Sequence, residues 1–184
     1  MCVKFDSRDL ALTAVFGALY VVINVVQAFS VGNPTIYGPV QLRVADCLIA
    51  LAVLFGLPVV GGVTLGCFAS NFIYFLGVQD VMFGSLANLV AASVVFMLRK
   101  HRFVACFFGA LPIGLIVGSY LPIFFPFLLA PESLGFLPPV AAMIVSITIS
   151  SFIAVTLLGY LLLLALSRPA VLEPLKSHGL KTVS

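Results

Sequence analysis

Long apolar runs alternate with short polar segments along this chain, and the runs have the length that a membrane requires. They occupy about residues 9–29, 40–57, 59–77, 81–98, 103–125 and 138–166, each near the roughly 20 residues that cross a bilayer core as a helix. The last run exceeds one bilayer thickness, which predicts a tilted or protruding helix. Gly56 and Pro58 predict a tight turn between the second and third runs. The pattern predicts an all-α integral membrane protein, a single domain over residues 1–184 built as a bundle of six transmembrane helices.

Composition supports this class of protein and excludes others. Of the 184 residues, 62% are hydrophobic and 8% are charged, whereas soluble domains carry about 25% charged residues. The net charge of +3 comes from basic residues at the ends of the runs, so we expect contact with membrane lipid and no nucleic-acid partner. The charged start of the chain leads into a run too long for the apolar part of a signal peptide. We therefore expect residues 9–29 to be a span and not a cleaved leader.

Basic residues predict the orientation of the spans. Eight of the nine Lys and Arg residues precede the first run, separate the fourth from the fifth, or follow the sixth, and the ninth is Arg43. The connections 30–39, 78–80 and 126–137 contain none. Because short cytoplasmic loops are enriched in Lys and Arg, we expect both termini to be cytoplasmic in a cell-membrane protein.

Two charges stand inside the second run, in the stretch Gly38-Pro-Val-Gln-Leu-Arg-Val-Ala-Asp46. A charge at mid-helix costs about 2.5–3.5 kcal/mol on insertion scales, so such residues usually face a partner or a polar cavity. Spacing of i, i+3 places Arg43 and Asp46 on one helical face, within pairing reach. Two interpretations stay open: the pair belongs to a pocket, or it is structural, with Arg43 reaching toward the interface.

Other polar side chains lie at the same expected depth, toward the outer ends of the runs or in the outer loops. The candidates for a binding site are Tyr37, Gln41, Arg43, Asp46, Asn71, Tyr74, Asp80, Asn88, Tyr120 and Glu132. Buried polar groups without partners are costly, so they are expected to converge on each other or on a ligand. Convergence at one depth predicts a pocket that opens to the outside.

Several of these candidates also have structural interpretations. Asn71 and Asn88 are suited to joining helices by hydrogen bonds, and Asp80 is suited to capping a helix that starts at Val81. Tyr37 is equally compatible with an interfacial anchor, and Glu132 with a solvated loop charge. The uncharged segment 32–39 is either a lid over the pocket or an ordinary connection.

Small residues recur at four-residue spacing in three runs, which lets helix backbones approach closely. The third run has Gly62 and Gly66, and the fifth has Gly114 and Gly118; for both we expect packing inside the bundle. The first run has two such pairs, Thr13 with Gly17 and Ala14 with Ala18. For this run, internal packing and a docking face for another membrane subunit are both open.

The sequence carries no sign of catalysis or of a bound cofactor. No Gly-x-x-x-x-Gly-Lys-Ser/Thr stretch is present, so ATP-driven transport would need another subunit. His101 and His178 lie in expected cytoplasmic segments, away from the membrane serines, and the four cysteines form no C-x-x-C pair. We expect no enzyme, no metal and no cofactor in this chain.

Several stretches together carry a resemblance to a known family. They are Arg8-Asp-Leu, Ala18-Leu-Tyr-Val-Val22, Tyr37-Gly-Pro-Val-Gln-Leu-Arg-Val-Ala-Asp46, Gly62-Val-Thr-Leu-Gly-Cys-Phe-Ala-Ser-Asn71 and Asp80-Val-Met-Phe-Gly-Ser-Leu-Ala-Asn88. In order and spacing they resemble the QueT family, the substrate-binding S components of energy-coupling-factor (ECF) transporters for queuosine precursors. The resemblance covers most of residues 7–100.

The resemblance implies a six-helix S component with an outward binding site. Such a component docks on a transmembrane coupling subunit with two ATPase subunits, which use the ATP, and Ala14 and Ala18 match the docking motif. The alternatives are an S component for another small vitamin-like ligand and a standalone carrier coupled to ions through Asp46 or Asp80.

The implied ligand is a 7-deazaguanine base, which is flat and has an edge of donors and acceptors. Carboxylates suit its N–H groups, amides suit its carbonyl group, and aromatic rings stack on it. The best candidates for these contacts are Asp80, Asn71, Asn88, Gln41 and either Tyr37 or Tyr74. The last two runs lack the acidic residues that the family has there, so we expect a nitrile or other uncharged ligand to be preferred over the aminomethyl cation.

Overall fold

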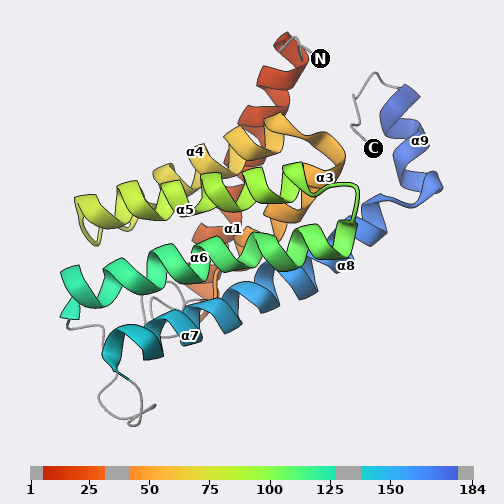
Figure 1. Cartoon of the computed structure of the whole chain (residues 1–184). Coiled ribbons are helices and arrows are strands. Elements are labelled where there is room, and N and C mark those ends of the chain that lie inside the picture. Colours follow the sequence, from red (N-terminus) through yellow and green to blue (C-terminus); the bar gives the residue numbers. More distant parts are fainter. Residues whose placement is uncertain (1–5, 32–41, 127–137, 178–184) are drawn as a thin grey trace.

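The computed structural model describes residues 6–31, 42–126 and 138–177, and these ranges consist of helices joined by short turns (Figure 1). In chain order the elements are α1 (Ser7–Val31), η1 (Val44–Leu51), α3 (Ala52–Phe55), α4 (Leu57–Ile73), α5 (Val78–Met97), α6 (Arg102–Phe124), α7 (Pro139–Ser151), η3 (Phe152–Leu158), α8 (Gly159–Leu166) and α9 (Pro169–Ser177). The predicted all-helical class is confirmed. Tyr37, Gln41, Glu132 and the expected lid segment 32–39 lie outside the described residues.

Four helical stretches within the described ranges are long and apolar enough to cross a membrane. They are Ser7–Val31, Val78–Met97, Arg102–Phe124 and the continuous stretch Pro139–Leu166, while Val44–Phe55 and Leu57–Ile73 are apolar but shorter. Large apolar side chains such as Phe29, Leu65 and Phe72 are more than half exposed, as expected of side chains that meet lipid. The molecule is a multi-pass membrane protein by these features, and the count of six spans and the cytoplasmic termini stay predictions.

The second predicted run is not a regular α-helix. It begins as the 3₁₀-helix η1 and continues into the single turn α3. A 3₁₀-helix rises about 2.0 Å per residue, against 1.5 Å in an α-helix, so η1 covers more depth with fewer residues. Gly56, with φ of 68°, ends α3 in a conformation that favours glycine. Pro58 stands in the first turn of α4, which confirms the predicted tight turn.

The small residues of α4 pack against α1. A Cβ atom on Gly62 would lie 2.6 Å from Cβ of Phe16, and one on Gly66 would lie 2.6 Å from Cβ of Tyr20. Thr13 is buried in the same contact. Internal packing is therefore confirmed for the third run, and it also accounts for the Thr13 and Gly17 face of the first.

The small residues of α6 pack in the same way against α7. A Cβ atom on Gly114 would lie 2.7 Å from Cα of Thr148, and one on Gly118 would lie 2.5 Å from Cα of Ile144. The two backbones therefore approach more closely than any larger residue allows, which confirms internal packing for the fifth run.

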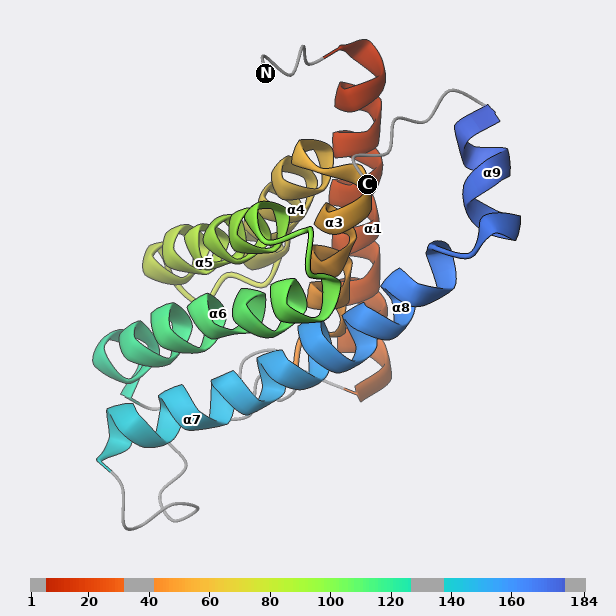
Figure 2. The ribbon, with the colours of Figure 1, turned by 45° about the vertical axis from the view of Figure 1, so that its right-hand side comes forward.

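The last predicted run is continuous from α7 to α8 but changes its winding in the middle. Residues Phe152–Leu158 form the π-helical segment η3. Beyond it, Gly159 brings α8 onto η1, since a Cβ atom there would lie 3.0 Å from the carbonyl oxygen of Cys47 and 2.9 Å from Cβ of Ala50. Figures 1 and 2 show α5, α6 and α7 side by side, α1 crossing them, and α9 extending away from the bundle.

Candidate functional site

Three buried polar side chains from three elements meet in the middle of the bundle. The hydroxyl of Tyr20 on α1 donates to Oδ1 of Asp46 on η1 at 2.6 Å. The amide of Asn88 on α5 donates to both partners, to the Tyr20 hydroxyl oxygen at 2.9 Å and to Asp46 Oδ1 at 3.3 Å. All three side chains are at most 3% exposed. Together they form a hydrogen-bonded junction of α1, η1 and α5.

Gln27 fixes the point where η1 begins and so positions Arg43. Its amide nitrogen donates to the carbonyl oxygen of Leu42, and its amide oxygen accepts from the backbone N–H of Val44 at 3.0 Å. These two bonds satisfy the backbone on both sides of Arg43, which is the N-terminal flanking residue of η1. A buried amide on α1 thus holds the main chain from which the guanidinium projects inward.

Arg43 extends this polar cluster toward α4 and α5. Its Nη1 donates to Oδ1 of Asn71 at 3.0 Å, and the Asn71 amide nitrogen donates to the backbone carbonyl of Asp80 at 3.0 Å. The Asp80 carboxylate accepts from the hydroxyl of Tyr120 on α6 at 2.6 Å. Each of these residues is buried. Contrary to the pairing suggested by their spacing, Arg43 and Asp46 form no direct ion pair with each other, because each side chain bonds to residues of other helices.

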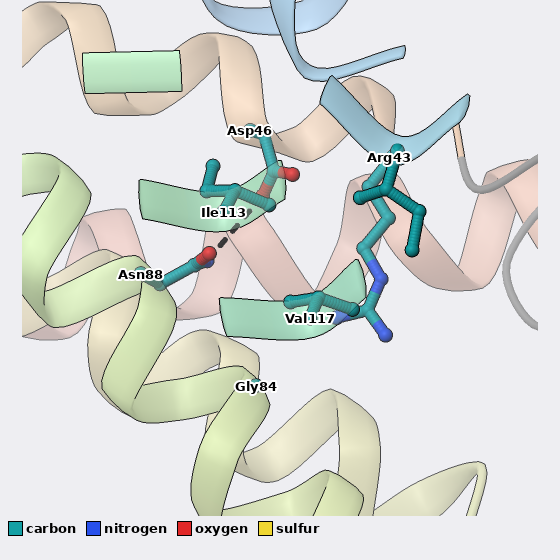
Figure 3. Close-up of a pocket in the computed structure, with 7 residues that line it drawn as sticks. Arg43, Asp46, Gly84, Asn88, Ile113 and Val117 are labelled. Atoms are coloured by element: carbon teal, nitrogen blue, oxygen red, sulfur yellow. Dashed lines mark hydrogen bonds between the residues drawn. The ribbon is translucent and has the colours of Figure 1, made fainter. Parts of the chain in front are cut away.

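A small cavity lies between these groups and an apolar wall. Its volume is about 10 Å³, and its lining consists of Arg43, Asp46, Gly84, Asn88, Ile113, Val117 and Ile147. Figure 3 shows the side chains of Ile113 and Val117 beside the polar groups of Asp46, Asn88 and Arg43. About 10–15 Å³ on this measure holds one water molecule, whereas ligand pockets are typically about 300–1,000 Å³. The cavity therefore has room for about one water molecule, and a larger guest would require its walls to move apart.

Some buried polar atoms of the bundle have no hydrogen-bond partner. Among the described residues these are Nε and Nη2 of Arg43, Oδ2 of Asp80 and Oδ1 of Asn24. Unpaired buried groups cost about 1–3 kcal/mol each, and more where the group is charged. Of these residues only Arg43 lines the cavity.

Gly84 makes the arrangement of Asn71 possible. It lies on α5 and lines the cavity. A Cβ atom there would lie 2.5 Å from Nδ2 of Asn71 and 3.6 Å from the hydroxyl of Tyr120. The missing side chain leaves room for the amide that connects Arg43 with Asp80.

Most of the predicted site residues within the described ranges come together. Arg43, Asp46 and Asn88 line the cavity, and Asn71, Asp80 and Tyr120 support it. Asn71 and Asn88 also join helices, as their structural interpretation predicted. One expectation is wrong: Asp80 does not cap a helix starting at Val81, because α5 begins at Val78 and the side chain bonds Tyr120 instead. Tyr74, half-buried where α4 ends, is not in the lining of this cavity and stays a predicted contact.

Tyr20 was not among the predicted site residues. A tyrosine inside an apolar run is common, and its two partners lie 26 and 68 positions away. The sequence signal that could have identified Tyr20 was its four-residue spacing from Asn24, which puts both side chains on one face of α1. In the structure the Asn24 amide donates to the Tyr20 carbonyl at 3.1 Å and to the Ser70 hydroxyl at 3.3 Å. The apolar lining residues carried no signal that distinguishes them from lipid-facing ones.

The two small-residue pairs of α1 have different surroundings. Thr13 and Gly17 face α4, whereas Ala14 and Ala18 are exposed. All four residues line a shallow groove of about 320 Å³ between α1 and α4, and the other lining residues include Leu10, Val21 and Leu65. The groove is almost entirely apolar.

Within the described ranges, no group of three His, Cys, Asp or Glu side chains is placed to hold a metal ion.

Comparison with known proteins adds a relationship to this geometry. The family model described as QueT transporter matches residues 10–168. The protein named Queuosine precursor transporter QueT from Lactococcus lactis subsp. cremoris (strain MG1363) is 36% identical over 91 residues, which is 50% of this chain and 51% of that relative. The aligned part thus spans about half the length of the curated relative. No solved structure matches the chain.

Proposed function

The chain belongs to the QueT transporter family, and from this premise we propose that it is the substrate-binding S component of an ECF-type importer. It takes up a queuosine precursor, a 7-deazaguanine base, from the extracellular side of the cell membrane and delivers it to the cytoplasm. The relative from Lactococcus lactis is named for queuosine precursors, which supports this choice of ligand.

The observation that carries the proposal is the polar cluster around the closed cavity. Buried side chains from α1, η1, α4, α5 and α6 converge there, in a molecule whose surface is otherwise strongly apolar. Such groups are expensive inside a membrane and usually mark a substrate path. The unpaired Nε and Nη2 of Arg43 give a guest donors to bind, and the carboxylate of Asp46 in the lining gives it an acceptor.

The ligand contacts divide into two groups. Arg43, Asp46 and Asn88 line the cavity and are positioned for direct contact once it opens. Asn71, Asp80 and Tyr120 hold them in place from behind. Tyr37, Gln41 and Glu132 remain proposed contacts on the sequence pattern alone.

Energy for transport comes from partner subunits in this proposal. Ala14 and Ala18 present an exposed apolar groove on α1, and small residues let a second helix approach closely. A transmembrane coupling subunit seated in this groove would connect the chain to two ATPase subunits. The sequence itself has no nucleotide-binding stretch of the kind that such ATPases carry.

The decisive experiment is native purification of the full chain from its membrane, followed by mass analysis of any retained small molecule and of co-purifying proteins. We expect a retained small molecule with the mass of a 7-deazaguanine base, and we expect two ATPase subunits and a membrane subunit among the co-purifying proteins. A retained vitamin-like molecule of another class would assign the chain to a different substrate. Uptake by the lone chain in vesicles under an ion gradient would instead establish a standalone carrier.

A further inference from the structure

The guanidinium of Arg43 has one whole edge without a partner. Nη1 donates to Asn71 Oδ1 at 3.0 Å and contacts Sγ of Cys67 at 3.5 Å, whereas Nε and Nη2 are buried and unpaired. In the planar guanidinium, N–H bonds of Nε and of one terminal nitrogen point the same way and form a two-donor fork. The side chain is 8% exposed. A fork of two donors is thus held ready inside the protein.

Asp46 supplies the complementary acceptor. Its Oδ1 is occupied by Tyr20 and Asn88, and no described residue donates to its Oδ2. Arg43 and Asp46 line the same cavity of about 10 Å³, which has room for about one water molecule. Figure 3 draws both side chains among the residues that line this cavity. A donor fork and a free acceptor therefore belong to two residues that line one cavity.

The charges of these two groups limit what can bind between them. A carboxylate or phosphate would satisfy the Arg43 fork but would bring a negative charge against Asp46. An ammonium group would satisfy Asp46 but would face Arg43. A lactam, which is a ring carbonyl beside a ring N–H, offers an acceptor and a donor along one rigid, uncharged edge.

We infer that Arg43 and Asp46 form a subsite for the lactam edge of a heterocyclic ligand. The Arg43 fork donates to the carbonyl oxygen, and Asp46 Oδ2 accepts the adjacent ring N–H. The choice of 7-deazaguanine as the heterocycle rests on the proposed function, since its six-membered ring carries such an edge. The side chains of Ile113, Val117 and Ile147, which form the apolar wall, are left to cover the ring faces after the cavity opens.

Two bases of nearly the same size test this subsite. The first is 7-cyano-7-deazaguanine, which has the lactam. The second is 7-cyano-7-deaza-2,6-diaminopurine, in which an amino group replaces the carbonyl group and a ring nitrogen without hydrogen replaces the ring N–H. The order of donor and acceptor along the edge is thereby reversed. Binding of each base to the purified full chain in lipid nanodiscs is measured by calorimetry. We expect the lactam base to bind at least about 100-fold more tightly, because sites built around hydrogen bonds reject mismatched partners strongly.

Substitutions locate the discrimination. Asp46→Asn keeps the shape but can turn its amide to suit either base, so we expect the preference to fall below about tenfold. Arg43→Lys replaces the fork by a point charge and is expected to reduce the preference in the same direction. Ser85→Ala is the control, because the Ser85 hydroxyl bonds the carbonyl of Val81 in its own helix at 2.6 Å; it keeps the full preference. Size-exclusion profiles show whether each variant is folded.

The outcomes separate this inference from the proposed function. If the wild-type chain binds both bases equally well, or if folded Asp46→Asn and Arg43→Lys keep the full preference, the lactam subsite is wrong while the proposed ligand class stands. If the folded wild-type chain binds neither base, the proposed function is wrong and the subsite falls with it.

Discussion

The hydroxyl of Tyr20 donates a 2.6 Å hydrogen bond to the carboxylate of Asp46, which joins the first helix to the 3₁₀-helix that follows it. Both side chains are buried, and Asn88 donates to both. This bond links the longest apolar helix of the N-terminal half to the charged stretch of the second run. It is consequently the first contact to test for its part in stability.

Removing the hydroxyl in Tyr20→Phe should destabilise the fold by about 1–3 kcal/mol, because a buried carboxylate loses its closest donor. Thermal unfolding of the purified protein in detergent, followed by helical circular dichroism, measures this change. Tyr160→Phe is the matched control, since the Tyr160 ring packs edge-on against Phe103 and its hydroxyl bonds no described residue. Equal melting temperatures for the two variants would contradict the prediction.

Adding a methyl group in Gly84→Ala should weaken binding of 7-cyano-7-deazaguanine by about tenfold or more. The new Cβ would lie 2.5 Å from Nδ2 of Asn71, so the amide must leave the position from which it accepts from Arg43. A shift of about 1.4 kcal/mol corresponds to tenfold in affinity. Gly61→Ala is the control, because its Cβ would meet only the side chain of Thr13, at 3.2 Å; wild-type affinity in both variants would refute the role given to Gly84.

A bulky residue in the α1 groove should stop transport without affecting ligand binding. Ala14→Leu fills the groove that we assign to the coupling subunit. The residue is exposed and lies six positions before Tyr20, about 120° around α1 from it. We expect uptake by cells to fall to background while calorimetric affinity stays within about twofold, since distant sites usually act independently. Ala11→Leu, also exposed on α1 but absent from the groove lining, should transport normally. Loss of binding as well as uptake in Ala14→Leu would indicate damage to folding.

Overpacking at the α6–α7 contact should destabilise the bundle. In Gly114→Ala the Cβ would lie 2.0 Å from Oγ1 and 2.7 Å from Cα of Thr148, and rotation of the Thr148 side chain relieves only the first clash. Inserted methyl groups in packed interiors cost about 1–3 kcal/mol. Thermal unfolding measures the loss, and the double variant Gly114→Ala with Thr148→Ala should recover only part of it, because the backbone contact remains. Full recovery would show that the side chain alone limits the approach.

The ligand's side group gives a further prediction. The described ranges of α6, α7, η3 and α8 contain no acidic residue, so a ligand cation finds no additional carboxylate there. We expect the nitrile base to bind more tightly than the aminomethyl base in a direct calorimetric comparison at neutral pH. A strong preference for the aminomethyl cation would refute this expectation.

The polar part of the site could be predicted because polar residues are conspicuous in apolar runs. Arg43, Asp46, Asn71, Asp80 and Asn88 were identified for this reason, since burying them without partners is costly. Their actual pairing could not be predicted. The i, i+3 spacing suggested that Arg43 pairs with Asp46, but in the structure each side chain bonds a residue of another helix. The local spacing describes only what an isolated helix allows.

The apolar part of the site could not be predicted for the opposite reason. Ile113, Val117 and Ile147 line the cavity, yet in sequence they are identical in kind to residues that face lipid. In a soluble protein, burial gives a helix one apolar side, but a membrane helix is apolar all round. The 3₁₀ winding of η1 was missed as well, because residues 44–51 are all compatible with an ordinary α-helix.

The π-helical segment Phe152–Leu158 sets how the two ends of the last span are rotated about their common axis. Such segments close wider turns than an α-helix does. Because each wider turn closes with one more residue than an α-helical turn, deleting one residue from 152–158 would restore regular winding and keep the rest of the span close to its present rotation. Gly159 would then stay on the surface of η1 on which it rests. The segment can therefore lose one residue more easily than α8 can, where a deletion would turn everything beyond it by about 100°.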